Sequence, residues 1–226
     1  MTPKERLIFA LDVSTRREAL ALCDELAGEV GMFKVGLELF VSEGPDLVRE
    51  VARRAPVFLD LKLHDIPATV GRAAAVADRL GVHYLTVHVD EGGRSLAAAV
   101  EACSATRILG ITVLTSISDA DLQAAGLSTN VEQTVLQRAQ LAAERGVAGI
   151  VCSGQEASRV REAIPKSMEV ITPGVRPAGT NADDQARVVT PAMARLAGAD
   201  RIVVGRPIRD AKDRVSAARA LVAELG

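Results

Sequence analysis

The sequence predicts an α/β fold, a (β/α)8 TIM barrel that forms a single domain over residues 1–226. Eight short apolar runs rich in β-branched residues recur at intervals of roughly 20–40 residues, as strands do. Stretches rich in Ala, Leu, Arg and Glu with helical spacing separate them. Strands that alternate with helices give a parallel sheet, and eight such units suit a closed barrel. A doubly wound open sheet is the alternative, but no GxGxxG follows the first run to support it.

The predicted strands follow one another along the whole chain. They are expected at 6–12, 32–36, 57–63, 84–89, 108–114, 148–152, 169–174 and 201–205. The clearest helices are expected at 15–31, 132–147 and 213–226. Apolar residues keep helical spacing through the first of these, and Gly28 and Gly31 are its stop signals.

Two segments between predicted elements are longer than the rest. They cover 115–131 and 173–187 and are rich in Gly, Pro, Ser, Thr, Asn and Asp. Both follow strands at the end of the barrel where active sites lie, so each is a candidate lid. An ordinary surface loop is an equally good interpretation.

Composition excludes several classes of function. A net charge of -2, 2% aromatic residues and no Trp argue against a nucleic-acid-binding surface. No apolar run reaches the roughly 18 residues of a membrane span, and residues 1–12 lack the features of a signal peptide. Three widely spaced cysteines without a CxxC pair predict free thiols in a reducing cytoplasm. We therefore expect a cytoplasmic protein that does not contact membranes.

Charged residues gather at the ends of the predicted strands, where barrel enzymes carry their active sites. They are Asp12 after the first strand, Lys34 on the second, Asp60, Lys62 and Asp65 on and after the third, and Asp90 after the fourth. Elsewhere the strands are apolar. Several convergent ionisable groups at a barrel mouth indicate a site.

The third strand, "VFLDLKL", carries charge on one face only. Side chains alternate along a strand, so Asp60 and Lys62 share the face toward the barrel mouth. The other face holds Leu59, Leu61 and Leu63 and is expected to pack against the outer helices.

A buried charge is costly unless it is paired, so Asp60 and Lys62 are expected to neutralise one another, joined by Lys34. A paired polar plug in the barrel core is the alternative to an active site. Asp12 and Asp65 favour the site. An ammonium between carboxylates stabilises a developing carbanion and delivers a proton to it, and it is a poor Schiff-base nucleophile.

A phosphate site is predicted at the last strands. The loops after strands seven and eight often bind phosphate in barrels. There Gly205 lets the backbone approach a ligand, Arg206 supplies a fork of donors, and Arg176 and Gln185 lie in the preceding long segment. A turn with a surface arginine is the alternative. The three histidines, His64, His83 and His88, lack zinc spacing, so no metal site is predicted.

Seven motifs in order resemble orotidine 5′-phosphate decarboxylase, a family of metal-free and cofactor-free enzymes of UMP synthesis. They are "FALDV", "FKVGLELF", "DLKLHDIPATV", "TVHVDEGG", "LGITVLTS", "TPGVRPAG" and "VVGRPI", and they span nearly the whole chain. The resemblance implies decarboxylation of orotidine 5′-phosphate to UMP and carbon dioxide.

The resemblance also implies a role for each matched residue. Lys62 would donate the proton to carbon six, with Asp60 beside the substrate carboxylate and Lys34 and Asp65 completing the charged network. A homodimer is implied, with Asp65 and Thr69 reaching the neighbouring subunit's site. The implied substrate contacts are Asp12, Lys34, Asp60, Ile66, Thr69, Thr115, Ser116, Arg176, Gln185, Gly205 and Arg206.

Two other functions remain open. Sugar-phosphate decarboxylases and aldolases of the same superfamily, of the keto-gulonate-phosphate decarboxylase and hexulose-phosphate synthase type, share a D-x-K-x-x-D strand but use magnesium, with an acid where this chain has Lys34. A cation at that position opposes metal binding. A non-catalytic phosphate-binding barrel is the third possibility, but it would be expected to have lost part of the charged set.

Overall fold

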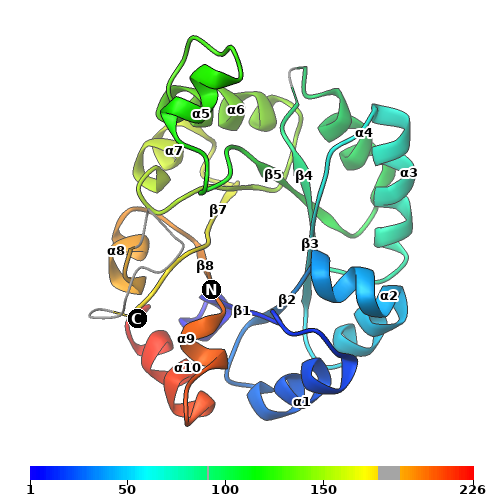
Figure 1. The fold of residues 1–226 in the computed structure, drawn as a ribbon, viewed down its shortest axis with the longest axis vertical. Coiled ribbons are helices and arrows are strands. Elements are labelled where there is room, and N and C mark those ends of the chain that lie inside the picture. Colours follow the sequence, from blue (N-terminus) through cyan, green and yellow to red (C-terminus); the bar gives the residue numbers. More distant parts are fainter. Residues whose placement is uncertain (91, 178–188) are drawn as a thin grey trace.

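The computed structural model describes residues 1–90, 92–177 and 189–226. Eight parallel strands pair in chain order and close into a barrel, with β1 beside β8 (Figure 1). This confirms the predicted fold class. The strands are β1 (Leu7–Ala10), β2 (Met32–Gly36), β3 (Val57–Leu63), β4 (Tyr84–His88), β5 (Arg107–Ile111), β6 (Gly149–Val151), β7 (Glu169–Thr172) and β8 (Arg201–Val204).

Helices form the outer ring of the barrel. After the short η1 (Lys4–Arg6), they are α1 (Arg16–Leu26), α2 (Leu37–Ala52), α3 (Pro67–Asp78), α4 (Arg94–Ala102), α5 (Asp119–Ala124), α6 (Val131–Glu144), α7 (Ala157–Ala163), α8 (Pro191–Leu196), α9 (Arg206–Arg209) and α10 (Arg214–Ala223). In the described part of the chain, none of these helices has the length and apolar character that crossing a bilayer requires.

The predicted elements differ from the observed ones mainly after the fifth strand. That strand was expected to reach Leu114 but ends at Ile111. The chain leaves the sheet there, and Arg138 of α6 donates to the Thr112 carbonyl oxygen at 2.7 Å. The following segment is not a uniform loop, since it contains α5. Ser118 and Asp121 cap this helix reciprocally in an S-x-x-D capping box, which the sequence analysis did not recognise.

Two apolar clusters lie on opposite sides of the strands. The larger one packs between sheet and helices and includes Leu59, with Leu61 and Leu63 partly buried against it. The leucine face of β3 therefore points outward, as alternation predicts. The inner cluster fills the barrel with Ile8, Ala10, Met32, Phe58, Tyr84, Leu109, Ile171 and Val203. The barrel is thus a packed core rather than a pore.

A polar cluster closes the N-terminal end of the barrel. Glu169 of β7 accepts hydrogen bonds from the Tyr84 hydroxyl at 2.7 Å, from Arg201 Nε at 2.8 Å and from Arg107. Both guanidinium groups also lie over the Tyr84 ring. Burial would raise the pKa of Glu169, but the donors from Arg201, Tyr84 and Arg107 outweigh it and hold the pKa below its ordinary value. Tyr84 belongs to the inner cluster as well, and Glu169, Arg201 and Arg107 form a polar floor at its N-terminal end.

Glu169→Gln is expected to destabilise the fold by about 2 kcal/mol at pH 7, because two arginines lose the carboxylate that neutralises them. A group with a depressed folded pKa stabilises the fold above its unfolded pKa, about 4.3 for Glu. The difference between wild type and variant should therefore shrink as the pH falls below about 4. Urea denaturation across pH measures this.

The exposed Glu162 is the matched control, and Glu162→Gln should change the unfolding free energy by less than about 0.5 kcal/mol. A Glu169→Gln variant as stable as wild type at pH 7 would show that the floor adds nothing to stability. Any activity should stay near the wild-type value. The floor lies at the N-terminal ends of the strands, whereas the predicted site lies at their C-terminal ends.

Candidate active site

Strand β3 ends in a distortion that delivers Lys62 to the barrel mouth. Leu59 pairs with Leu85 and Leu63 with Val87. Between these two pairs β3 advances four residues while β4 advances two, so the register shifts. Within this bulge Lys62 has φ 50°, the only positive φ of a non-glycine residue among those the structure describes. Such a conformation costs about 1 kcal/mol or more and is concentrated at functional sites.

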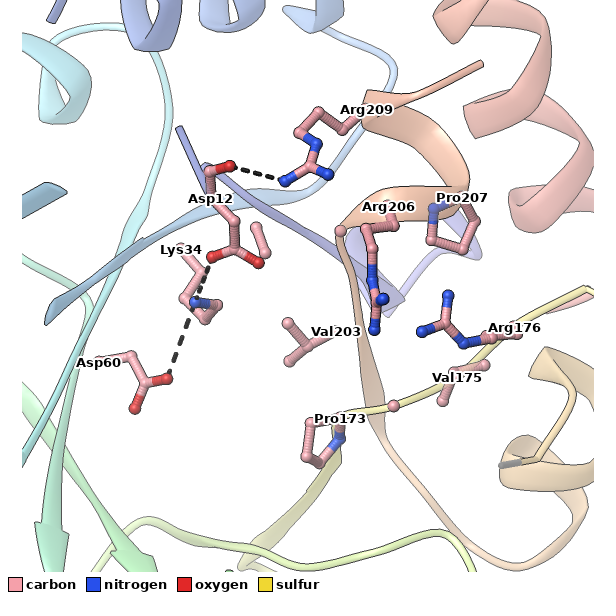
Figure 2. A pocket seen from close by; sticks show the side chains of 13 residues that line it. Asp12, Lys34, Asp60, Pro173, Val175, Arg176, Val203, Arg206, Pro207 and Arg209 are labelled. Atoms are coloured by element: carbon pink, nitrogen blue, oxygen red, sulfur yellow. Dashed lines mark hydrogen bonds and ion pairs between the residues drawn. The ribbon is translucent and has the colours of Figure 1, made fainter. Parts of the chain in front are cut away.

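Four charged side chains of alternating sign form a row across the mouth. Lys34 Nζ lies 3.1 Å from Asp12 Oδ1 and 3.9 Å from Asp60 Oδ2. Lys62 Nζ lies 2.7 Å from the same Asp60 oxygen. Figure 2 shows Asp12, Lys34 and Asp60 on one side of the cavity. We call Asp12, Lys34, Asp60 and Lys62 the charged row.

The row is buried at its centre and open at its ends. The side chains of Asp60 and Lys34 are 11% and 13% exposed, and those of Lys62 and Asp12 are 31% and 50% exposed. Inner charges need partners because desolvation is costly, and each inner member has two opposite charges beside it. The row therefore holds two ammonium groups in fixed positions next to a partly dry cavity.

Two glycines make room for the row. A Cβ at Gly36 would lie 3.1 Å from Lys34 Nζ, and a Cβ at Gly205 would lie 3.0 Å from Asp12 Oδ2. Gly205 was predicted to let the backbone approach a phosphate, and this stays a prediction. Gly205 lines the cavity described below, and its backbone also lies close to the Asp12 carboxylate.

A cavity of about 500 Å³ opens beside the row. The row's Asp12, Lys34 and Asp60 form one end, and Arg176 and Arg206 converge on the other (Figure 2). Between them lie the apolar side chains of Val203 and Pro173. A volume of this size suits a small-molecule ligand. One end offers guanidinium groups for an anion, and the other offers ammonium groups and carboxylates.

A second hollow of about 210 Å³ shares Asp12, Lys34 and Asp60 with the cavity and adds Lys62. Lys62 thus lies at the border of the two hollows, in hydrogen-bond contact with the Asp60 carboxylate that both share.

Five predicted site residues lie away from the cavity. Asp65 and Ile66 are exposed in the loop after β3, and Thr69 lies in the first turn of α3. The Asp65 carboxylate accepts a hydrogen bond from the Ile66 N–H, and among the described residues no ion pair joins it to Lys62. Thr115 and Ser116 line a separate hollow after β5. Gln185 lies outside the described residues.

Other residues at the mouth were not predicted from the sequence. Arg209 lines the cavity, and its guanidinium donates to the Asp12 carbonyl oxygen at 2.8 Å. Thr86 contacts the row from β4. Alternation along β4 would have indicated Thr86, since it shares a strand face with Tyr84 and His88. Arg209 had only its closeness to Arg206 as a signal.

The two histidines nearest the row face each other. The rings of His64 and His88 lie 5.1 Å apart. Burial, with added repulsion from His64, Arg138 and Lys62, lowers the pKa of His88 to about 4, so this ring is neutral at pH 7. Among residues 1–90, 92–177 and 189–226, no group of three or more His, Cys, Asp or Glu side chains is arranged to hold a metal ion.

Comparison with known proteins gives a consistent result. Residues 5–221 match the profile of the orotidine 5′-phosphate decarboxylase / HUMPS family. The chain is 51% identical to an orotidine 5′-phosphate decarboxylase of Anaeromyxobacter sp. (strain K), with all of both chains covered. It is 45% identical to the enzyme of that name from Heliobacterium modesticaldum, over all of this chain and 97% of the relative.

A solved structure is also similar. The crystal structure of orotidine 5′-phosphate decarboxylase from Lactobacillus acidophilus superposes with a TM-score of 0.87 at 33% identity, over 97% of this chain and 98% of the other.

Proposed function

The chain belongs to the orotidine 5′-phosphate decarboxylase / HUMPS family, and from this membership we propose that it converts orotidine 5′-phosphate to UMP and carbon dioxide in pyrimidine biosynthesis. The observation that carries the proposal is the charged row facing two arginines across one cavity. A nucleotide with a phosphate at one end and a carboxylated pyrimidine at the other has matching chemistry.

The phosphate end is assigned to Arg176, Gly205 and Arg206, with Gln185 as a further ligand from outside the described residues. Arg176 is only 6% exposed, so its guanidinium acts in a partly dry environment where a charge-assisted hydrogen bond is strong. Binding energy from this non-reacting group is available to lower the barrier at the pyrimidine. Thr115 and Ser116, on the loop after β5, are assigned to the pyrimidine end.

The reaction replaces one bond at carbon six by another. The bond to the carboxylate breaks, carbon dioxide leaves, and the electron pair stays on carbon six as a vinyl carbanion. Lys62 stabilises this charge and transfers a proton from Nζ to carbon six, and a solvent proton then restores the ammonium. Asp60 holds the Lys62 ammonium at 2.7 Å. Asp12 and Lys34 are assigned to the ribose hydroxyls.

A homodimer completes this site. Asp65 and Ile66 are exposed, and Ile66 presents an apolar side chain that is 66% exposed. On α2, Leu37 and Val41 add two more exposed apolar side chains one turn apart. Exposed apolar surface of this kind favours a protein contact. We propose that a second copy covers it and brings Asp65, Ile66 and Thr69 to the partner's site. The free cysteines agree with a cytoplasmic setting.

Activity is expected to need no metal and no cofactor. The Lys34 ammonium lies between the Asp12 and Asp60 carboxylates, at 3.1 and 3.9 Å, and opposes a divalent cation at that place. This separates the chain from magnesium-dependent sugar-phosphate enzymes of the same superfamily.

The assay follows the loss of orotidine 5′-phosphate absorbance together with release of carbon dioxide. After exhaustive treatment with a chelator, the rate should stay within about twofold of the untreated rate, since no step requires a Lewis acid. Added magnesium should not raise it. A rate that collapses with the chelator and returns with magnesium would instead favour the sugar-phosphate chemistry.

A further inference from the structure

Thr86 of β4 is a fully buried polar residue that none of the roles above uses. Its side chain points into the barrel between those of Tyr84 and His88 on the same strand face. A hydroxyl buried without a purpose is costly, so its partners matter. Both of its hydrogen-bond partners belong to β3.

The Thr86 hydroxyl bridges the two central residues of the reaction. It donates to Asp60 Oδ1 at 3.0 Å and accepts from the Lys62 backbone N–H at 2.9 Å. A hydroxyl has a single hydrogen, and an ionised carboxylate only accepts, so the direction of both bonds is fixed. The other Asp60 oxygen is occupied by the Lys62 and Lys34 ammonium groups.

Thr86 also lies at the irregular place in the sheet. The β3–β4 register is regular at Leu59 and resumes at Leu63, and the two extra residues of β3 lie opposite Thr86. Lys62 adopts its left-handed conformation within this bulge. A strained conformation persists only where its surroundings fix it, and the bond from the Lys62 N–H to Thr86 is the contact between this residue's backbone and the β4 side chains.

We propose that Thr86 is a positioning residue for decarboxylation: its hydroxyl fixes the Asp60 carboxylate and the Lys62 backbone relative to one another. This inference rests on the proposed function, and it adds a residue that touches no substrate. Without the hydroxyl, Asp60 rotates more freely and the Lys62 backbone loses its anchor. The ammonium then occupies the productive position for a smaller fraction of the time.

Thr86→Val tests the inference, because valine keeps the shape and removes the hydroxyl. We expect kcat to fall about 30- to 100-fold, as for a displacement of about 1 Å in a reacting group, with KM and the Kd for UMP within about threefold. Thr86→Ser restores the hydroxyl and should keep kcat within about fivefold of wild type. Steady-state kinetics and calorimetric titration with UMP supply the values.

Thr106→Val is the matched structural control. Thr106 is also a buried threonine, and its hydroxyl donates to the Val82 carbonyl oxygen at 3.0 Å, just before β4 begins. Thr106→Val should lower the melting temperature about as much as Thr86→Val does, but it should leave kcat unchanged. If Thr86→Val does not fold, Thr86→Ala takes its place, since it relieves any crowding by valine.

The outcomes separate the two proposals. A wild-type protein without decarboxylase activity overturns the proposed function. An active wild type with a Thr86→Val kcat within threefold of it overturns the positioning role alone. So does a Thr86→Ser variant as impaired as Thr86→Val, since the methyl packing and not the hydroxyl would then matter.

Discussion

Lys62→Ala should lower kcat by more than about 10⁴-fold while UMP binds with an affinity close to that of wild type. The proposed mechanism gives Lys62 both the stabilisation of the carbanion and the delivery of the proton. Each effect alone contributes about 10²- to 10³-fold or more. Binding survives because Arg176 and Arg206, which are assigned to the phosphate, are unchanged. Single-turnover assays and titration with UMP measure both quantities.

Lysine at an exposed position supplies the control. Lys166 is exposed just after α7, and Lys166→Ala should have the wild-type kcat. A Lys62→Ala protein with a tenth of the wild-type rate would refute the assignment of Lys62 as proton donor. Loss of UMP binding together with activity would mean that Lys62 contributes to the cavity rather than to the chemical step.

Mixed dimers of Lys62→Ala and Asp65→Asn should regain about a quarter of the wild-type activity, although each homodimer is nearly inactive. In a two-fold symmetric dimer whose sites take Lys62 from one chain and Asp65 from the other, a heterodimer has one intact site and one with both substitutions. Equal mixing makes about half of the dimers heterodimers, so about a quarter of all sites are intact. Unfolding and refolding the mixture produces them.

The matched control uses two residues of one chain's own site. Asp60 and Lys62 are 2.7 Å apart in the same chain, so every site of a Lys62→Ala and Asp60→Asn heterodimer carries one substitution. That mixture should remain inactive. If the Lys62→Ala and Asp65→Asn mixture also remains inactive while heterodimers are shown to form, Asp65 belongs to its own chain's site.

Alternation along β3 correctly predicted which of its side chains face the barrel mouth. It placed Asp60 and Lys62 on one face and three leucines on the other, and the observed packing agrees. It did not predict that Lys62 leaves the regular strand conformation. The bulge depends on a register shift against β4, which is a property of two strands together and has no signal within "VFLDLKL". Thr86, which stands opposite the bulge, was missed for a different reason: alternation along β4 puts it on one face with Tyr84 and His88, but no charge drew attention to it.

Resemblance supplied what physical reasoning about the residues could not. Nothing in the spacing of Asp65 or Thr69 indicates a second chain, because an interface depends on surface shape. The exposed position of Asp65 in the structure fits that assignment but does not identify a partner. By contrast, α5 could have been predicted from the sequence, because Ser118 and Asp121 form a capping box at its start. The many turn-forming residues around α5 led us to expect a loop there instead.

The left-handed backbone at position 62 lowers the stability of the fold, while the proposed reaction needs the lysine side chain there. At most positions in the barrel, selection for stability and selection for turnover favour similar residues. At position 62, glycine would relieve the backbone, yet the proposed mechanism requires a long basic side chain there. On the proposed mechanism, a lineage freed from the need for this reaction would gain stability by replacing Lys62 with glycine.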